Sequence, residues 1–150
     1  KAVQKIEKIK QRSDIKGFIC LIDSLSRMEK YVGNIPSVAI DILEASTTPT
    51  TVIYQDGYEV AENVLSDSGS IALRITDHAF CRSLLKQFKK PIVSTSANLS
   101  GGKPATNLDQ VSKDLIKQID FVANVPSTCS GKASSMISIK DNLEISILRP

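Results

Sequence analysis

Two short segments of the sequence carry residue types that bind phosphate groups. The first holds three cations, Lys10, Arg12 and Lys16, at the end of a predicted helix and on the loop behind it. Arginine binds phosphate as a bidentate fork and lysine binds it as a mobile point charge. If the helix unwinds near Arg12, all three cations can converge on one triphosphate. The alternative is that these cations only complement the dipole at the carboxyl end of the helix.

The net charge of the chain is +3, and the whole positive excess lies in residues 1–16. Residues 1–16 carry six cations and two carboxylates, whereas the other residues carry thirteen cations and fourteen carboxylates. A local excess of cations attracts phosphate in nucleotides or along nucleic-acid backbones. On charge alone, a solvated helix face with extra lysines is the favoured interpretation of this pattern.

The second segment runs over 94–106, reads STSANLSGGKPAT and follows the apolar residues Pro91, Ile92 and Val93 of a predicted strand. Ligands of open α/β sheets bind beyond the carboxyl ends of strands, which is where this segment lies. Its small side chains let backbone N–H groups approach an anion, and Ser94, Ser96 and Asn98 add polar groups. The phosphate-binding GxxxxGK[ST] pattern is absent, and an ordinary surface loop is the alternative interpretation.

Single residues elsewhere could join these segments. Arg74 lies among apolar residues of a predicted strand, so it either faces a site or pairs with a buried acid. His78 is the only histidine and the three cysteines are far apart, which excludes a zinc site. A Ser–His–Asp or Cys–His mechanism would depend on His78 alone, and no GxSxG turn supports one. We therefore expect no distinct catalytic residue and no metal ligands from the protein.

Helical and strand patterns alternate along the chain, which indicates α/β layers around one sheet. The last strands follow one another without a helix, so part of the sheet should be antiparallel. A capping-box spacing from Ser26 to Glu29 predicts one helix start, and Asn107 predicts another. The expected helices are 2–11, 26–32, 37–45, 77–88 and 107–119, and the expected strands are 17–22, 51–54, 70–75, 92–94, 121–122, 136–139 and 145–148.

Length and composition bound the remaining possibilities. With 150 residues, 41% hydrophobic and 23% charged, the chain fits one globular domain over 1–150 and is not disordered throughout. No apolar run is long enough for a membrane span, and no secretory leader opens the chain. Three widely spaced cysteines without a leader predict a reducing, cytoplasmic location and no membrane partner. Because the chain begins at Lys1 without Met, we expect an upstream segment to be missing.

Four motifs occur in a fixed order: Lys-x-Arg-x-x-x-Lys, Ala-x-Arg-x-x-Asp-His, Ser-x-Ser-Ala-Asn-x-Ser-Gly and a closing Ile-Leu-Arg-Pro. In this combination the chain resembles the YrdC/YciO family, whose best-known members are threonylcarbamoyl-AMP synthases. The resemblance covers essentially the whole chain. It implies a twisted, mixed α/β sheet with flanking helices around a positively charged cavity. It also implies that the N-terminal strand and helix of the family should lie upstream of Lys1.

The resemblance implies a role for each matching residue. The cationic motif and the signature loop would bind ATP, together with a serine before the strand that carries Arg74 and the closing arginine. Arg74 would hold the threonine carboxylate, and two serines would lie beside it. The implied ATP-binding residues are Lys10, Arg12, Lys16, Ser70, Ser96, Asn98 and Arg149, and the implied threonine-binding residues are Arg74, Ser94 and Ser134.

The family resemblance also implies a reaction. Its enzymes are nucleotidyltransferases that combine L-threonine, bicarbonate and ATP, with Mg²⁺ accompanying ATP. Their product, threonylcarbamoyl-adenylate, passes to a downstream transferase that modifies tRNA. The alternative is a non-catalytic module of the YciO branch that binds double-stranded RNA or tRNA through the same basic cavity.

Overall fold

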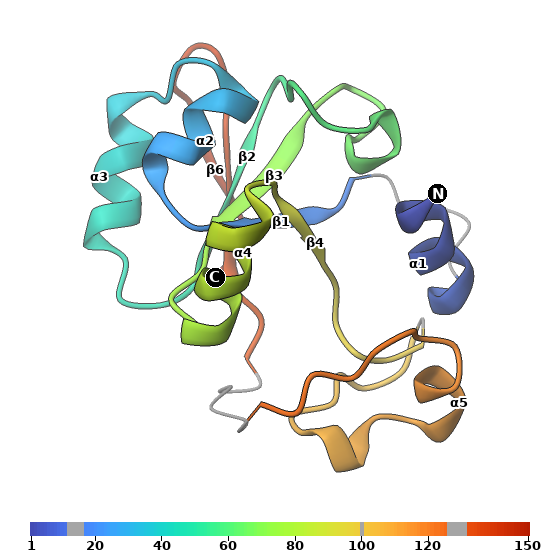
Figure 1. Ribbon diagram of the computed structural model, residues 1–150. Helices are drawn as coiled ribbons and strands as arrows, with labels where there is room; N and C mark the ends of the chain where they lie inside the picture. The colour runs from blue at the N-terminus through green and yellow to red at the C-terminus, as the bar shows by residue number, and fades with distance from the viewer. Residues whose placement is uncertain (12–16, 100, 126–131) are drawn as a thin grey trace. The chain divides into compact units, whose positions relative to one another are not determined.

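A computed structural model describes residues 1–11, 17–99, 101–125 and 132–150. Its contacts divide the chain into two compact units (Figure 1). The first unit comprises Lys1–Ile15 and Thr95–Lys132, and the second comprises Lys16–Ser94 and Ala133–Pro150. We call them the loop unit and the sheet unit, because the second contains the whole β-sheet. The assignment of 1–150 to a single domain stays a prediction.

The sheet unit is built on six strands in the order β4-β1-β3-β2-β5-β6. The pairs β1–β3 and β2–β5 are parallel, and β1–β4, β2–β3 and β5–β6 are antiparallel. The prediction of a mixed sheet is therefore confirmed. The strands are β1 (Ile19–Ile22), β2 (Thr50–Tyr54), β3 (Ile71–Ile75), β4 (Ile92–Ser94), β5 (Ser135–Ile139) and β6 (Ile145–Arg149).

Helices of the sheet unit are α2 (Leu25–Val32), α3 (Ser37–Ala45), α4 (Ala79–Phe88) and the 3₁₀ turn η1 (Glu62–Val64). Each α-helix overlaps a predicted one, but the expected start of the second helix was wrong. Ser24, not Ser26, caps α2: its backbone is extended and its hydroxyl accepts a 3.3 Å hydrogen bond from the Arg27 N–H. Ser26 lies inside the first turn, where it cannot act as the cap.

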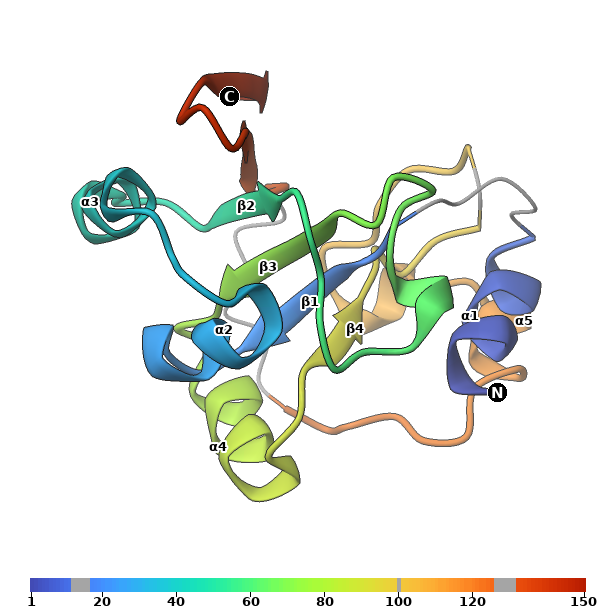
Figure 2. The same ribbon diagram turned by 90° about the horizontal axis from the view of Figure 1, so that it is seen from above.

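The two faces of the sheet differ in burial. One face carries Cys20, Val52 and Leu73, none more than 1% exposed, and α2 and α4 lie on one side of this sheet in both views (Figures 1 and 2). The Tyr54 hydroxyl on that face donates to Met28 Sδ of α2 at 2.9 Å, which identifies the face that α2 covers. Ala72 and Arg74 of β3 point to the opposite face, and both are half-buried. The second face is therefore the more accessible one.

The loop unit contains α1 (Ala2–Lys10), the 3₁₀ turn η2 (Leu108–Gln110) and the short helix α5 (Lys113–Ile116). The helix expected over 107–119 is wrong as one element. Asn107 does cap a turn, since its side chain accepts from Gln110 N, but the chain is extended at Val111 and Ser112 caps a new helix. The strand expected at 121–122 is also wrong, because Phe121 is 82% exposed and two apolar residues define no strand.

Cysteine burial agrees with the interpretation of Cys20 as a small core residue. Burial raises the pKa of the Cys20 thiol to about 12, so this thiol is not a nucleophile at neutral pH. Cys81 is half-buried. Cys129 lies outside the described residues. Among the described helices, none has the length and apolar character that crossing a bilayer requires.

Candidate functional site

Lys10 is the best-defined of the predicted phosphate-binding cations. It is the last residue of α1, and it is only 4% exposed. Its ammonium donates to Ser96 O at 2.6 Å, to Asn98 Oδ1 at 3.2 Å and to Asn98 O. Three residues that the sequence predicts to bind ATP therefore meet within the loop unit. In this arrangement the ammonium fixes the conformation of the loop that follows β4.

The loop itself is closed by Asn98. Its side-chain amide donates to Leu99 O at 2.9 Å and to Gly102 O at 2.6 Å, and Gly102 N donates back to Leu99 O at 3.0 Å. A Cβ at Gly102 would lie 3.2 Å from Leu99 O, and Gly101 has a φ of 77°, so both glycines are needed for this tight turn. The Gly-Gly pair in the sequence thus shapes the loop around Asn98.

This arrangement can bind an anion without a protein base. A buried positive charge lies under a loop whose Ser96 side chain is exposed. Fixed charge and exposed hydroxyls stabilise phosphate oxygens by charge-assisted hydrogen bonding. The other two predicted cations, Arg12 and Lys16, lie outside the described residues. Their part in phosphate binding stays a prediction.

In the sheet unit, Arg74 and Ser94 share one face of the sheet. Arg74 pairs with Leu21 of β1, and Ser94 pairs with Ile19 of the same strand. Residues two apart on a strand point to the same face, so both side chains lie on the face opposite Leu73. Both are half-buried. The structure thus brings two of the three predicted threonine-binding residues to the accessible face of the sheet.

Ser134, the third of them, lies beside the same face. It is 2% exposed, and its Oγ is 2.8 Å from Oγ1 of the fully buried Thr51. Arg149 at the end of β6 donates from Nε to Ser134 O at 2.7 Å and from Nη2 to Ser134 Oγ at 3.2 Å. The antiparallel pairing of Val52 with Leu73 places Thr51 level with Arg74. Sequence reasoning missed Thr51, because only the β2–β5 pairing reveals its contact with Ser134.

Ser70 belongs to a local serine cluster before β3. Its hydroxyl lies 2.7 Å from Ser66 Oγ, its N–H donates to Ser66 Oγ at 3.1 Å, and its carbonyl accepts from Ser66 N at 3.0 Å. Ser68 Oγ lies 2.9 Å from Ser66 Oγ. The cluster closes the turn that leads into β3. A contact between Ser70 and a nucleotide stays a prediction.

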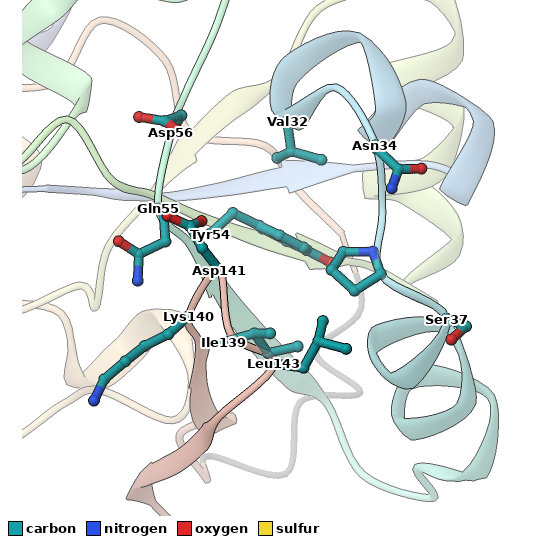
Figure 3. Close-up of a pocket in the computed structure, with 11 residues that line it drawn as sticks. Val32, Asn34, Ser37, Tyr54, Gln55, Asp56, Ile139, Lys140, Asp141 and Leu143 are labelled. Carbon is teal, nitrogen blue, oxygen red and sulfur yellow. The ribbon is translucent and has the colours of Figure 1, made fainter.

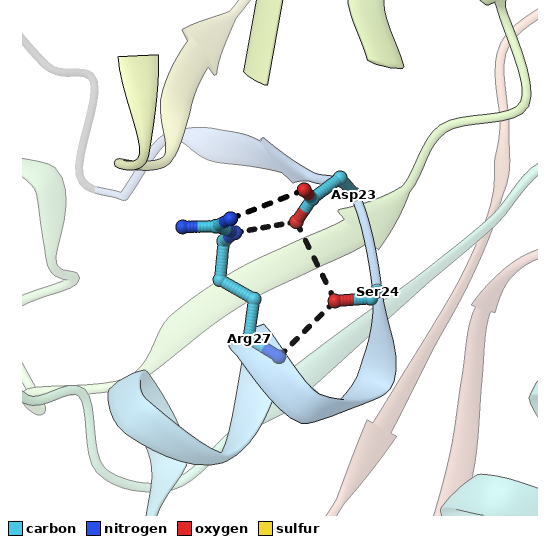
Figure 4. A network of polar contacts seen from close by, with 3 residues as sticks. All are labelled: Asp23, Ser24 and Arg27. Carbon is cyan, nitrogen blue, oxygen red and sulfur yellow. Dashed lines mark hydrogen bonds and ion pairs between the residues drawn. The ribbon is translucent and has the colours of Figure 1, made fainter. Parts of the chain in front are cut away.

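An ion pair that sequence reasoning also missed follows β1. Asp23 is 7% exposed and accepts from Arg27 Nε at 2.5 Å and from Arg27 Nη2 at 3.2 Å (Figure 4). The hydrogen bond from Arg27, together with its positive charge, holds the pKa of the Asp23 carboxyl below its ordinary value. The i,i+4 spacing of the two residues was the available signal. This pair fixes the first turn of α2 against the end of β1.

Replacement of Asp23 by Asn should therefore destabilise the protein at neutral pH. We expect a loss of about 2 kcal/mol in the free energy of unfolding at pH 7, the size of a hydrogen bond to a charged group. A carboxyl whose pKa is lowered on folding contributes its stability above the unfolded pKa of about 3.9 and loses it as the pH falls through the folded value. In urea titrations, the difference between wild type and D23N should thus shrink below about pH 4. Asp41→Asn, at an exposed position on α3, is the control, and an equal loss in D41N would contradict the assignment.

A cavity of about 400 Å³ lies elsewhere in the sheet unit (Figure 3). Tyr54 and Ile139 line it from the sheet, and Asp56 and Asp141 line it from the segments that follow β2 and β5. Tyr54 belongs to the face that α2 covers, opposite Arg74. None of the described residues that the sequence predicts for substrate binding lines this cavity. The cavity is therefore distinct from the candidate site.

The candidate site offers no cage for a metal ion. Within the described residues, no group of three or more His, Cys, Asp or Glu side chains converges where an ion could be held. The donor set of Lys, Arg, Ser and Asn favours anions, because only the hydroxyl and amide oxygens could approach a cation. These residues therefore fit phosphate and carboxylate groups rather than a resident metal.

Comparisons with known proteins agree with the fold and the motifs. The Sua5/YciO/YrdC family model, described as "Telomere recombination", matches residues 1–150. The threonylcarbamoyl-AMP synthase of Psychromonas ingrahamii is 36% identical over 115 residues, which cover 75% of this chain and 60% of that protein. The threonylcarbamoyl-AMP synthase of Vibrio campbellii is 31% identical over 151 residues, covering 99% of this chain and 80% of that protein.

A solved structure has the same fold. The crystal structure of P. abyssi Sua5 complexed with L-threonine matches with a TM-score of 0.86 and 26% identity, and the match covers 99% of this chain. The chain spans only 44% of the P. abyssi protein, as it spans 60% of the Psychromonas relative. The expected twisted, mixed sheet with helices is thus confirmed, and the positive charge of the predicted cavity stays a prediction.

Proposed function

Because this chain belongs to the Sua5/YciO/YrdC family, we propose that it is a threonylcarbamoyl-AMP synthase, a nucleotidyltransferase that uses L-threonine, bicarbonate and ATP. The observation that carries the proposal is the family match over all 150 residues, together with relatives that bear this name. The likeness to a Sua5 structure complexed with L-threonine supports threonine as the amino-acid substrate. The comparisons do not favour the alternative of a non-catalytic RNA-binding module.

The accessible face of the sheet supplies the proposed threonine site. Arg74 would bind the carboxylate of threonine, because a guanidinium pairs with a carboxylate through two parallel hydrogen bonds. Ser94 lies on the same face, two strands away, and Ser134 lies beside Thr51, which is level with Arg74. Hydroxyl groups there would bind the polar atoms of the amino acid. The arrangement supports a small, zwitterionic ligand at this face.

The loop unit supplies the proposed contacts to the ATP phosphates. Lys10 holds the loop of Ser96 and Asn98 in place and contributes its positive charge there. Arg12 and Lys16 would add the charge that a triphosphate needs, and Ser70 and Arg149 would complete the nucleotide contacts. A triphosphate at neutral pH carries several negative charges, so a site made of cations and hydroxyls is suited to it.

The proposed reaction needs alignment and charge neutralisation more than a catalytic base. The threonine amine and bicarbonate combine into a carbamate with loss of water. An oxygen of the carbamate then forms a bond to the α-phosphorus of ATP, the bond from that phosphorus to the bridging oxygen breaks, and pyrophosphate leaves. Because the attacking oxygen is already anionic, catalysis rests on positioning and on electrostatic stabilisation of the phosphate oxygens.

Mg²⁺ would enter this reaction as part of the substrate. The described residues provide no cluster of ligands for a metal of the protein's own. Mg²⁺ commonly binds substrate phosphates while keeping several waters, so it would arrive on the β- and γ-phosphates of ATP. The product would then pass to a separate transferase that modifies tRNA.

Calorimetric titration of MgATP tests the proposal, with and without L-threonine and bicarbonate. We expect ATP to bind, and to bind about tenfold more tightly when threonine is present, since bound threonine adds contacts at the reacting end. An ATP affinity that does not change when threonine is added would contradict the proposal that threonine is the second substrate. No ATP binding, combined with salt-dependent binding of double-stranded RNA, would overturn the synthase in favour of the RNA-binding module.

A further inference from the structure

Thr51 carries a fully buried hydroxyl group with one specific partner. It lies on β2 with no exposed surface, and its Oγ1 is 2.8 Å from Oγ of Ser134, which is 2% exposed. A buried hydroxyl costs free energy unless it is hydrogen-bonded. Valine has the same shape and would pack here without that cost. Packing alone therefore does not explain why this position carries a threonine.

Ser134 connects this hydroxyl to Arg149. Its Oγ accepts from Arg149 Nη2 at 3.2 Å, and its carbonyl accepts from Arg149 Nε at 2.7 Å. A serine hydroxyl can accept two hydrogen bonds and donate one, so it can serve Arg149 and Thr51 together. With Thr51 in place, the Ser134 side chain is held in the rotamer that meets the guanidinium.

Arg149 depends on this contact for its orientation. It is the last residue of β6, a strand at the edge of the sheet on which three of five residues are exposed. A long side chain at an edge strand has many rotamers, and ordering it costs conformational entropy. Both of its hydrogen bonds given above go to Ser134, so the geometry of Ser134 sets the direction of the guanidinium.

We propose that Thr51 is a positioning residue that, through the Ser134 hydroxyl, fixes the Arg149 guanidinium beside the sheet face that carries Arg74. Thr51 itself touches no substrate. The inference rests on the proposed function for the identity of its ligands, ATP at Arg149 and threonine at Ser134. It adds that the buried hydroxyl of Thr51 orients both Ser134, on the threonine side, and Arg149, on the ATP side.

Thr51→Val is the direct test, because it removes the hydroxyl and keeps the volume. We expect the Kd for MgATP to rise about tenfold, the size of one lost hydrogen bond of about 1.4 kcal/mol. Thr50→Val is the matched control: Thr50 is its neighbour on β2 and is 8% exposed, but its hydroxyl donates to Thr48 O at 3.0 Å. T50V should bind MgATP within twofold of wild type. An equal loss in both variants would overturn the proposal.

Rescue separates positioning from stability. Thr51→Ser keeps the hydroxyl but removes a buried methyl group, so it should lower Tm at least as much as Thr51→Val while restoring ATP affinity to within about twofold of wild type. If ATP affinity falls in both variants in proportion to Tm, whether or not the hydroxyl is present, a positioning role is contradicted. In a Ser134→Ala background, Thr51→Val should have no further effect, since the connection is already broken. Additive losses would also contradict it.

A readout without substrate keeps this inference separate from the proposed function. In NMR spectra, hydrogen exchange of the Arg149 Nη2 hydrogens, which are donated to Ser134 Oγ, should be about tenfold faster in T51V than in wild type or T51S, as expected when one hydrogen bond of about 1.4 kcal/mol is lost. Unchanged exchange in T51V would overturn the positioning role even if ATP binds. If the wild-type protein binds no ATP, the proposed function fails, while the exchange measurement still decides the role of Thr51.

Discussion

Lys10→Met is expected to weaken MgATP binding by at least a hundredfold, or roughly 3 kcal/mol. The ammonium of Lys10 donates to Ser96 O and to two oxygens of Asn98 from a position that is 4% exposed. Without it, the two oxygens of Asn98 lose this charged donor, whereas Ser96 O keeps the Asn98 N–H at 3.0 Å. Hydrogen bonds to a charged group contribute about 1.5–3 kcal/mol each. The loop that we propose to bind phosphate then loses both its shape and a positive charge. Calorimetry with MgATP measures the affinity, and Tm should fall by about 5 °C.

Lys8→Met is the matched control for this prediction. Lys8 lies on the same helix, α1, carries the same charge and is exposed. Removing its charge should change ATP affinity by less than about threefold, because an exposed charge is screened by water and salt. Equal losses in K8M and K10M would show that only the total positive charge of α1 matters. That result would contradict a specific role for the buried ammonium.

Arg74→Met is expected to remove the effect of threonine on ATP binding while leaving ATP binding itself within about twofold of wild type. In the proposed site, the guanidinium pairs with the threonine carboxylate, and hydrogen bonds between charged groups contribute about 1.5–3 kcal/mol each. Threonine affinity should therefore fall at least about a hundredfold. Arg74→Lys should not restore it, because an ammonium cannot form the bidentate pair. Titration of threonine in the presence of MgATP measures both variants.

The control for this variant is Arg82→Met, which removes a guanidinium from an exposed position on α4. R82M should retain the effect of threonine. If Arg74→Met weakened ATP and threonine binding equally, the separation of an amino-acid site on the sheet face from the phosphate-binding loop would be wrong. If it left threonine binding unchanged, another residue would have to hold the carboxylate.

Most of the secondary structure followed from local patterns. Helix α1 was predicted from the spacing of Val3, Ile6 and Ile9, and β4 was predicted with its observed bounds. Such patterns are readable because side chains repeat every 3.6 residues on a helix and every two on a strand. The consecutive strands at the end of the chain also predicted the antiparallel β5–β6 pair.

The errors arose where two local signals competed. Ser24 and Ser26 can both cap a helix, and only the extended backbone at Ser24 decides between them. Asn107 and Ser112 are also both capping residues, and each starts its own short element. At 121–122, hydrophobicity predicted a strand, yet these residues form no strand and Phe121 is 82% exposed. Propensity alone does not settle such choices, because tertiary contacts override it.

The candidate site was likewise only partly predictable from the sequence. Its charged residues and signature loop were visible as motifs, but the partners of Lys10 lie 86 and 88 residues away in the sequence. The contact between Thr51 and Ser134 likewise joins residues 83 positions apart. No local pattern encodes such pairs, because they depend on strand order and on packing. The motifs therefore predicted which residue types matter, and the structure added what holds them in place.

Release of pyrophosphate from ATP tests the proposed function most directly. Purified protein would be incubated with MgATP, L-threonine and bicarbonate, and with each of the three omitted in turn. A threonylcarbamoyl-AMP synthase should release pyrophosphate only when all three are present, because the carbamate that attacks the α-phosphate forms from threonine and bicarbonate. Release that does not depend on threonine, or no release in the complete mixture, would contradict the proposed function.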